Sequence, residues 1–181
     1  MAEILFAKFR SYTIDELLNK LDEGYYTALD IICTNARNCA AQLSVYTDHP
    51  SWGLYAAMYS SLLDDVERLL LFRKEVVVPY VQELKAKVQD GHNCKNCSGK
   101  CHVGHNAQLM SLLDSHREIK EVLSALHKAT LPLHNYMDYP DGYRILRNEI
   151  AVIDTMLNEL FYIEESSLIP KIMEAQKAIN A

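Results

Sequence analysis

Residues 146–178 read LRNEIAVIDTMLNELFYIEESSLIPKIMEAQKA, and their hydrophobic residues recur with the period of one long helix. Apolar side chains three or four positions apart form a stripe, whose members are Leu146, Ile150, Ile153, Leu157, Leu160 and Leu168. One charged residue, Glu164, lies on this stripe, six residues before Pro170. A stripe of this kind is typical of an amphipathic helix that packs against a core.

An earlier part of the chain repeats this arrangement. When Pro79 is aligned with Pro170, Arg73 falls on Glu164. The earlier stripe is also apolar apart from its one charge, and it consists of Tyr59, Leu62, Val66, Leu69, Arg73, Val76 and Tyr80. Two helical hairpins with matching late prolines predict a pseudo-twofold four-helix bundle, into which each hairpin introduces one charge.

Composition and charge restrict the class of protein. The chain has 181 residues, 49% of them hydrophobic, with only 6 glycines and 5 prolines, which favours one domain of long helices. The net charge of −6 disfavours nucleic acid and anionic membranes as partners. No apolar run reaches the roughly 20 residues of a membrane-spanning helix. The first residues contain an early acid and no long apolar region, so we expect no secretory signal there. We therefore expect a single cytoplasmic domain over residues 1–181, with no nucleotide cofactor.

Four long helices are predicted by the apolar pattern. Thr13 and Glu16 form a capping box that begins the first helical segment, in which Gly24 is a potential break. The long helices are expected over about residues 25–46, 54–87, 106–126 and 143–178. No segment has the alternating pattern of a strand. The predicted fold is all-α, an antiparallel up-and-down four-helix bundle with a Cys/His-rich insertion, residues 92–105, between the second and third helices.

Polar side chains interrupt the buried stripes of the expected helices. They are Tyr25, Tyr46, Arg73, His116 and Glu164. A buried charge without a partner is costly, so these residues should contact one another or a metal ion. One interpretation is a hydrogen-bonded core network in which Arg73 pairs with Glu164. The other is a metal site in the bundle core, where inward carboxylates and imidazoles are common ligands. Periodicity alone favours the network.

Three short segments resemble motifs of the hemerythrin-like (HHE) domain, and within it the di-iron proteins that repair iron–sulfur centres. The segments are residues 45–50 (VYTDHP), 115–119 (SHREI) and 160–170 (LFYIEESSLIP). The resemblance covers about Tyr25 to Ala175. It implies the four-helix bundle and a set of iron ligands that project into its core.

Most of the family's iron-ligand positions are substituted in this chain. They fall on Tyr25, Tyr46, Leu69, Arg73, His116, Leu160 and Glu164. Only His116 and Glu164 keep the ligand type of the family. Leucine cannot ligate a metal, and the cation of Arg73 opposes a dication. The resemblance therefore implies the fold but not the di-iron chemistry, although tyrosinate can bind ferric iron and a remodelled mononuclear iron site is an alternative.

Residues 92–105 read HNCKNCSGKCHVGH and hold three cysteines and three histidines. This density of thiols and imidazoles predicts a tetrahedral zinc site, because a two-residue gap lets a pair of sulfurs reach one ion. The candidate ligands are Cys94, Cys97, Cys101, His102 and His105, with His92 as a weaker candidate. A redox-active Cys94–Cys97 pair, an iron–sulfur cluster and a solvated loop with free thiols are the alternatives.

Three functions fit these features. The first is a metal-binding, non-catalytic protein that senses or handles metal in iron–sulfur or nitrosative stress. The second is a non-haem iron redox or iron–sulfur repair enzyme that uses His116, Glu164, Tyr25 and Tyr46. The third is an interaction domain in which zinc staples a loop. The sequence favours the metal-binding, non-catalytic protein, with zinc as the expected cofactor and iron as a second candidate. No catalytic residue is assigned. The sequence names no protein partner and leaves a homodimer open.

Overall fold

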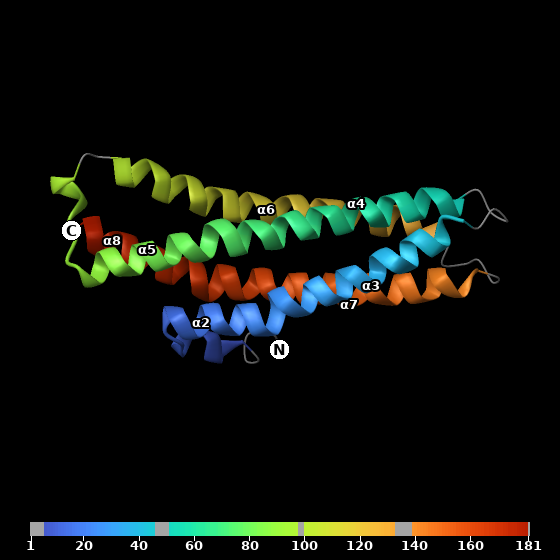
Figure 1. The fold of residues 1–181 in the computed structure, drawn as a ribbon, viewed down its shortest axis with the longest axis horizontal. Helices are drawn as coiled ribbons and strands as arrows, with labels where there is room; N and C mark the ends of the chain where they lie inside the picture. Colours follow the sequence, from blue (N-terminus) through green and yellow to red (C-terminus); the bar gives the residue numbers. More distant parts are fainter. Residues whose placement is uncertain (1–5, 46–50, 98–99, 133–138, 181) are drawn as a thin grey trace.

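A computed structural model describes the backbone of residues 6–45, 51–97, 100–132 and 139–180. It also describes the side chains of these residues except 51 and 100–106. All regular secondary structure in these ranges is helical, as the sequence predicted (Figure 1). The α-helices are α2 (Ile14–Leu21), α3 (Thr27–Leu43), α4 (Ser51–Phe72), α5 (Val78–Gln89), α6 (Lys100–Thr130), α7 (Asp141–Ile163) and α8 (Ile169–Asn180).

The first helical segment begins at the predicted capping box. The Thr13 hydroxyl accepts a hydrogen bond from the Glu16 backbone N–H at 3.3 Å, and the Thr13 N–H donates to the Glu16 carboxylate at 2.7 Å. These two bonds satisfy backbone groups that a helix N-terminus leaves without partners. The capping box that the sequence predicted is therefore confirmed.

Three π-helical segments join consecutive α-helices. They are η2 (Asp22–Tyr26), η3 (Arg73–Val77) and η6 (Glu164–Leu168). The last two begin at the two charged residues of the predicted repeat, and a proline follows each in the first turn of α5 or α8. A proline ring presses on the preceding helical turn and donates no hydrogen bond, and the wider π turn accommodates it. The sequence repeat thus corresponds to a repeated backbone feature.

Each π turn adds a residue and so shifts which side chains are buried after it. In η3, Val77 is buried although the uniform stripe predicted Val76. In η2, Tyr26 is fully buried, whereas Tyr25 is half-buried. A straight 3.6-residue period cannot anticipate this change, because one extra residue rotates the following positions by about 100° around the helix.

The long helices lie lengthwise beside one another (Figure 1). Helix α3 packs on α4 and α7, α4 packs on α6, and α5 packs on α8. The apolar stripe predicted for residues 146–168 is buried in this core, with all six of its apolar members under 5% exposed. Burial of such a stripe supplies most of the stability of a helical bundle.

The third long helix begins earlier than the sequence indicated. We expected it just after His105, but α6 begins at Lys100. Residues 100–106 contain no proline, and Gly104 does not stop the helix there, since a mid-helix glycine costs only about 1 kcal/mol. The backbone of Cys101, His102 and His105 therefore belongs to the first turns of α6, and only the first part of the 92–105 segment connects α5 to α6.

Candidate metal centre and buried charge network

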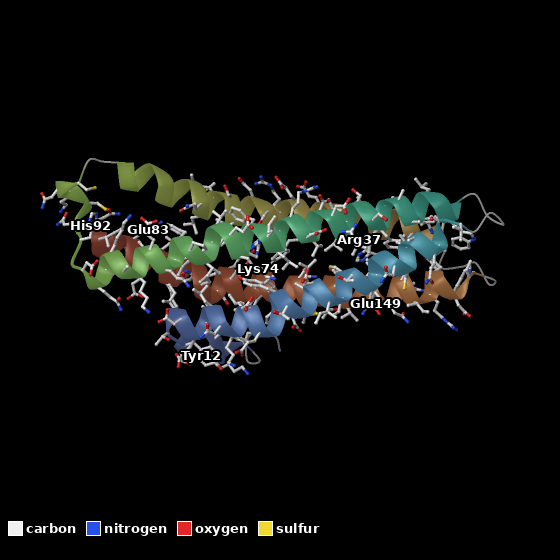
Figure 2. All side chains as sticks on the ribbon, viewed as in Figure 1. Tyr12, Arg37, Lys74, Glu83, His92 and Glu149 are labelled. Carbon is white, nitrogen blue, oxygen red and sulfur yellow. The ribbon has the colours of Figure 1, made fainter. Side chains whose placement is uncertain are left out.

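The connection from α5 to α6 starts with a left-handed glycine. Gly91 has φ of 64°, a value that favours glycine. The His92 N–H donates to the Lys87 carbonyl at 2.9 Å, and the Gly91 N–H donates to the Val88 carbonyl at 3.2 Å. This pair of bonds is a Schellman motif, which ends a helix and reverses the chain. It places His92 beside the ends of α5 and α8 (Figure 2).

A single 3₁₀ turn, η4 (Cys94–Asn96), positions Cys94 and Cys97. The Asn93 side chain accepts a hydrogen bond from the Lys95 N–H at 2.8 Å and so caps this turn. The Cys97 N–H donates to the Cys94 carbonyl at 3.3 Å, and the Cys97 thiol lies 3.1 Å from the same oxygen. The turn therefore holds both cysteines on one side of the connection.

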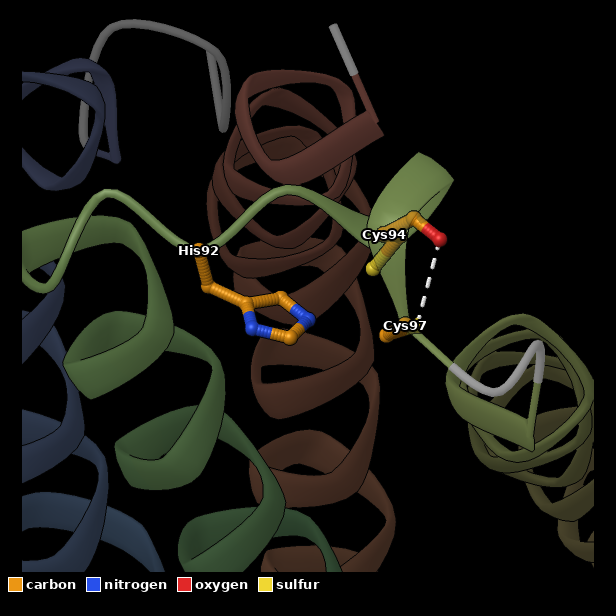
Figure 3. A group of neighbouring side chains, drawn as sticks. All are labelled: His92, Cys94 and Cys97. Atoms are coloured by element: carbon orange, nitrogen blue, oxygen red, sulfur yellow. Dashed lines mark hydrogen bonds between the residues drawn. The ribbon is translucent and has the colours of Figure 1, made fainter.

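His92, Cys94 and Cys97 form a group of potential metal ligands. One ring nitrogen of His92 and the two sulfurs all lie within 4.8 Å of one another. Figure 3 shows the imidazole directed from the connection toward the two cysteines, with α8 behind them. Cys94 is only 3% exposed and belongs to the hydrophobic core, and η4 packs against α8. The group is thus anchored on α8 and on the hydrophobic core.

The Nε2 atom of His92 is buried and has no hydrogen-bond partner within the described part of the chain. Burying a polar atom without a partner costs about 1–3 kcal/mol, and such atoms are rare in folded proteins. A nitrogen lone pair that faces two thiols is a ligand set for a soft or borderline metal ion. This atom is therefore the strongest local indication that the group binds a metal.

The structure brings together part of the ligand set that the sequence predicted. Cys94 and Cys97 lie together, and His92, which the sequence ranked as a weaker candidate, lies with them. The side chains of Cys101, His102 and His105 lie outside the described residues, so their role stays a prediction. The Asp90-Gly91 pair before His92 could have indicated that His92 is a stronger ligand candidate. A glycine after a helix permits the chain reversal that directs the imidazole toward the thiols.

A buried ion pair crosses the helical core between the first residue of η3 and the first residue of η6. Arg73 Nε donates to Glu164 Oε1 at 2.8 Å, and Arg73 Nη2 donates to Glu164 Oε2 at 2.8 Å. Both side chains are 0% exposed. Bidentate, charge-assisted hydrogen bonds of this kind are stronger and more specific in geometry than hydrogen bonds between neutral groups. The sequence prediction that Arg73 pairs with Glu164 is confirmed.

Glu164 receives hydrogen bonds from two further side chains. The Tyr26 hydroxyl donates to Oε1 at 3.3 Å, and His116 Nε2 lies 2.6 Å from Oε2. A carboxylate has about four lone-pair sites, and Arg73, Tyr26 and His116 together occupy two sites on each oxygen. A metal ion could ligate Glu164 only by displacing one of these partners.

The surrounding side chains complete the network. Arg73 Nη1 lies 3.2 Å from the Leu69 carbonyl and 3.4 Å from the Ser115 hydroxyl, and it donates to both. The Phe161 ring stacks on His116 with centroids 4.3 Å apart, and the Arg73 guanidinium carbon lies 5.9 Å from the Phe161 centroid. These contacts leave the guanidinium few unsatisfied donors. The arrangement is that of a closed hydrogen-bonded core.

The remaining residues of the predicted core pocket lie apart from this network or outside the described chain. The Tyr25 hydroxyl donates to Glu159 Oε2 at 3.2 Å. Burial, together with the Glu159 carboxylate, raises the pKa of Tyr25 to about 12. Tyr46 lies outside the described residues. Sequence reasoning missed Tyr26, and the Gly24 break in the first helical segment was the only signal of the shift in register.

The outer side of His116 faces solvent-exposed charges. His116 Nδ1 lies 2.9 Å from Glu165 Oε1, and Lys120 donates to the same oxygen at 3.3 Å. Burial alone would raise the pKa of Glu164, but the charge of Arg73 and the hydrogen bonds from His116 and Arg73 outweigh it, so that the pKa lies below its ordinary value. Burial raises the pKa of Tyr26 well above its ordinary value. The network is therefore built around an ionised Glu164 and a neutral Tyr26.

We expect the wild-type protein to lose stability as the pH falls below about 4.3, the ordinary pKa of glutamate. A carboxylate whose pKa is lowered by folding stabilises the fold above its unfolded pKa, and this contribution is lost as the pH falls through the folded value. The double variant Glu164→Gln/Arg73→Met lacks this titration. Urea denaturation from about pH 3 to about pH 7 should therefore give the double variant a shallower acid dependence. If the free energy of unfolding fell equally steeply with pH in the wild type and in the double variant, the lowered pKa of Glu164 would be contradicted.

Comparison with protein-family models, with curated proteins and with solved structures finds no match to this chain. Within the described ranges, no helix combines the length and the apolar character that crossing a membrane requires. The fold and the site by themselves define the class: an all-helical protein with a His/Cys/Cys group that could hold a metal ion.

Proposed function

We propose that this is a metal-binding protein of the hemerythrin-like class that holds its metal in the α5–α6 connection rather than in the bundle core. The observation that carries the proposal is the buried Nε2 atom of His92, which has no partner within the described chain and belongs to a group with two thiols. The core network supports the second half of the proposal, since every lone-pair site of Glu164 has a protein donor.

The proposed class requires an antiparallel up-and-down bundle, and contacts between the helices support that topology. His116 of α6 contacts Glu164, at the end of α7, and His127 of α6 contacts Asp154 of α7. The residue numbers rise along one helix as they fall along the other, which is the signature of antiparallel neighbours. The same reversal relates α4 and η3 to α6, where the contacting pairs are Tyr55–Ala129 and Arg73–Ser115.

We assign zinc to the site on the chemistry of its ligands. Zinc–ligand bonds of about 2.0–2.3 Å in a tetrahedral shell place ligand atoms roughly 3.3–3.8 Å apart. The ligand atoms of His92, Cys94 and Cys97 lie within 4.8 Å of one another, so each pair has to close by at most about 1.5 Å. Two thiolates and an imidazole leave one position for Cys101, His102 or His105. The helical start of α6 brings these three residues directly after the connection.

The proposed role is non-catalytic. The resemblance places bridging carboxylates at Arg73 and Glu164, and here an ion pair takes up those positions. A guanidinium in the core repels a dication, and its removal would leave Glu164 buried without its main partner. We therefore place the protein among sensors or handlers of metal, in the iron–sulfur or nitrosative stress that the resemblance implies, and not among the redox enzymes.

We expect less than one iron per chain in the bundle core. Leu69 and Leu160 cannot ligate, and Arg73 occupies both oxygens of Glu164. Protein purified aerobically from iron-supplemented cells should lack the visible absorption of an oxo-bridged or tyrosinate-bound iron site. Elemental analysis and the absorption spectrum provide the measurement. Two irons per chain with an oxo-bridge band would instead make the redox enzyme the better assignment.

The site itself is tested by replacing His92. We expect protein purified reduced and without chelator to carry about one zinc, and His92→Ala to bind zinc at least about tenfold more weakly, because one ligand of the shell is lost. Competition with a chromophoric chelator measures the affinity. His127→Ala is the matched control, because His127 is exposed on α6 and contacts Asp154 instead. If the wild-type protein carries no metal and its thiols react immediately with a thiol reagent, the segment is better explained as a redox-active Cys94–Cys97 pair or as a solvated loop with free thiols.

A further inference from the structure

A groove between α6 and α7 plays no part in the proposed function. It has a volume of about 800 Å³, and its floor includes Tyr59 of α4, Leu123 of α6 and Ile150 of α7. All three floor residues are buried, whereas most of the rim is exposed. A pocket of this size with an apolar floor is within the range that small ligands occupy.

Small side chains keep the groove open. Ser124 of α6 and Ala151 and Thr155 of α7 line it, at positions that flank the buried stripes of the two helices. Leucine at such positions would fill the space between packed helices, because side-chain size sets the distance between their axes. The groove therefore follows from the sequence of both helices rather than from a single missing side chain.

Two cations on the rim have no ion-pair partner within the described chain. Arg147 and Lys128 line the groove, and neither forms a salt bridge there, whereas Lys120 contacts Glu165 and His127 contacts Asp154. Arg147 also lies near the floor, since its charge opposes the rise in the pKa of the Tyr59 hydroxyl that burial causes. The groove is lined by three cations, Lys120, Lys128 and Arg147, and by one carboxylate, Asp154, so positive charge is in excess there although the net charge of the protein is −6.

The two cations lie toward one end of the groove. Lys128 is in the last turn of α6 and Arg147 is in the second turn of α7, and the two helices run in opposite directions here, as the His127–Asp154 and His116–Glu164 contacts indicate. The lining residues of α6 extend from Lys120 to Thr130, about 15 Å at 1.5 Å per residue. The groove therefore combines one cationic end with an elongated apolar floor.

We propose that this groove binds a single-chain amphiphile with an anionic head, such as a long-chain carboxylate. The Arg147 guanidinium and the Lys128 ammonium hold the head, because a guanidinium matches a carboxylate bidentately. The hydrocarbon chain lies over Ile150 and Leu123. An acidic helix of a partner protein fits less well, since a helix is about 10–12 Å across with its side chains and its several acids would need cations along the whole groove.

Binding of dodecanoate below its micellar concentration tests the proposal by titration calorimetry on the full chain. We expect saturable binding of one dodecanoate per chain, about tenfold weaker in Arg147→Gln. Arg144→Gln is the matched control, because Arg144 is an exposed arginine of the same helix that pairs with Asp141 outside the groove. Ala151→Leu, which fills the groove without a change in charge, should also weaken binding. Dodecyltrimethylammonium, which has the same tail and a cationic head, should not bind.

Each other outcome overturns the proposal. If no saturable binding is seen, the groove does not bind such an amphiphile. If Arg144→Gln loses as much affinity as Arg147→Gln, or if the cationic amphiphile binds equally well, the groove does not recognise an anionic head. Displacement of dodecanoate by an acidic amphipathic peptide that binds more tightly would assign the groove to a protein partner. Phosphatidylglycerol vesicles distinguish the source of the ligand, because co-sedimentation with them would indicate a bilayer surface rather than a free amphiphile. Circular dichroism verifies that each variant is folded.

Discussion

Replacing Glu164 by glutamine is expected to destabilise the fold by about 3–5 kcal/mol, because it leaves the Arg73 charge buried without a counter-ion. Arg73 is 0% exposed and donates to both oxygens of Glu164, so solvent water cannot reach the guanidinium to replace the lost charged acceptor. The loss is large relative to the total stability of a domain. Urea denaturation monitored by circular dichroism at neutral pH measures it.

A double-mutant cycle separates the pair from its surroundings. Arg73→Met in the Glu164→Gln background should recover much of the lost stability, since an apolar side chain of similar length replaces the uncompensated cation. Asp64→Asn is the matched control, because Asp64 pairs with Arg37 at 2.7 Å on the exposed surface. An exposed pair contributes only about 0–1 kcal/mol. Additive effects of the two core substitutions would refute the pairing.

Replacing Cys97 by serine is expected to abolish stoichiometric zinc and to loosen the connection between α5 and α6. Zinc binding provides folding free energy wherever its ligands are not held together without it. Proteolysis should therefore become faster between Asp90 and Asn106. Helical circular dichroism should stay nearly unchanged, because the buried stripes of the long helices lie elsewhere.

Cys39→Ser is the control for this experiment, since Cys39 is a half-buried cysteine of α3 outside the group. It should leave zinc content and proteolysis at the wild-type level. Unchanged zinc in Cys97→Ser would show that the metal is bound elsewhere. A large loss of helix would show that the connection, through Cys94 and its packing on α8, stabilises more of the bundle than we expect.

The sequence alone determined the helical class, the buried stripe of α7 and the start of the first helical segment. Each of these depends on residues within one or two helical turns, where periodicity and capping chemistry act directly. It also favoured the Arg73–Glu164 pair over a core metal site, because opposite charges on two buried apolar stripes can compensate each other, and the observed ion pair agrees with that interpretation. The matching prolines placed the two charges at equivalent positions of the repeat.

The tertiary structure decided which neighbours complete each site. The extra residue of η2 brings Tyr26 rather than Tyr25 to Glu164, and no side-chain period encodes such an extra residue. The reversal at Gly91 brings His92 to Cys94 and Cys97, and this depends on the backbone conformation of one glycine. The groove between α6 and α7 depends on both helices together, because small side chains leave space only where another helix faces them.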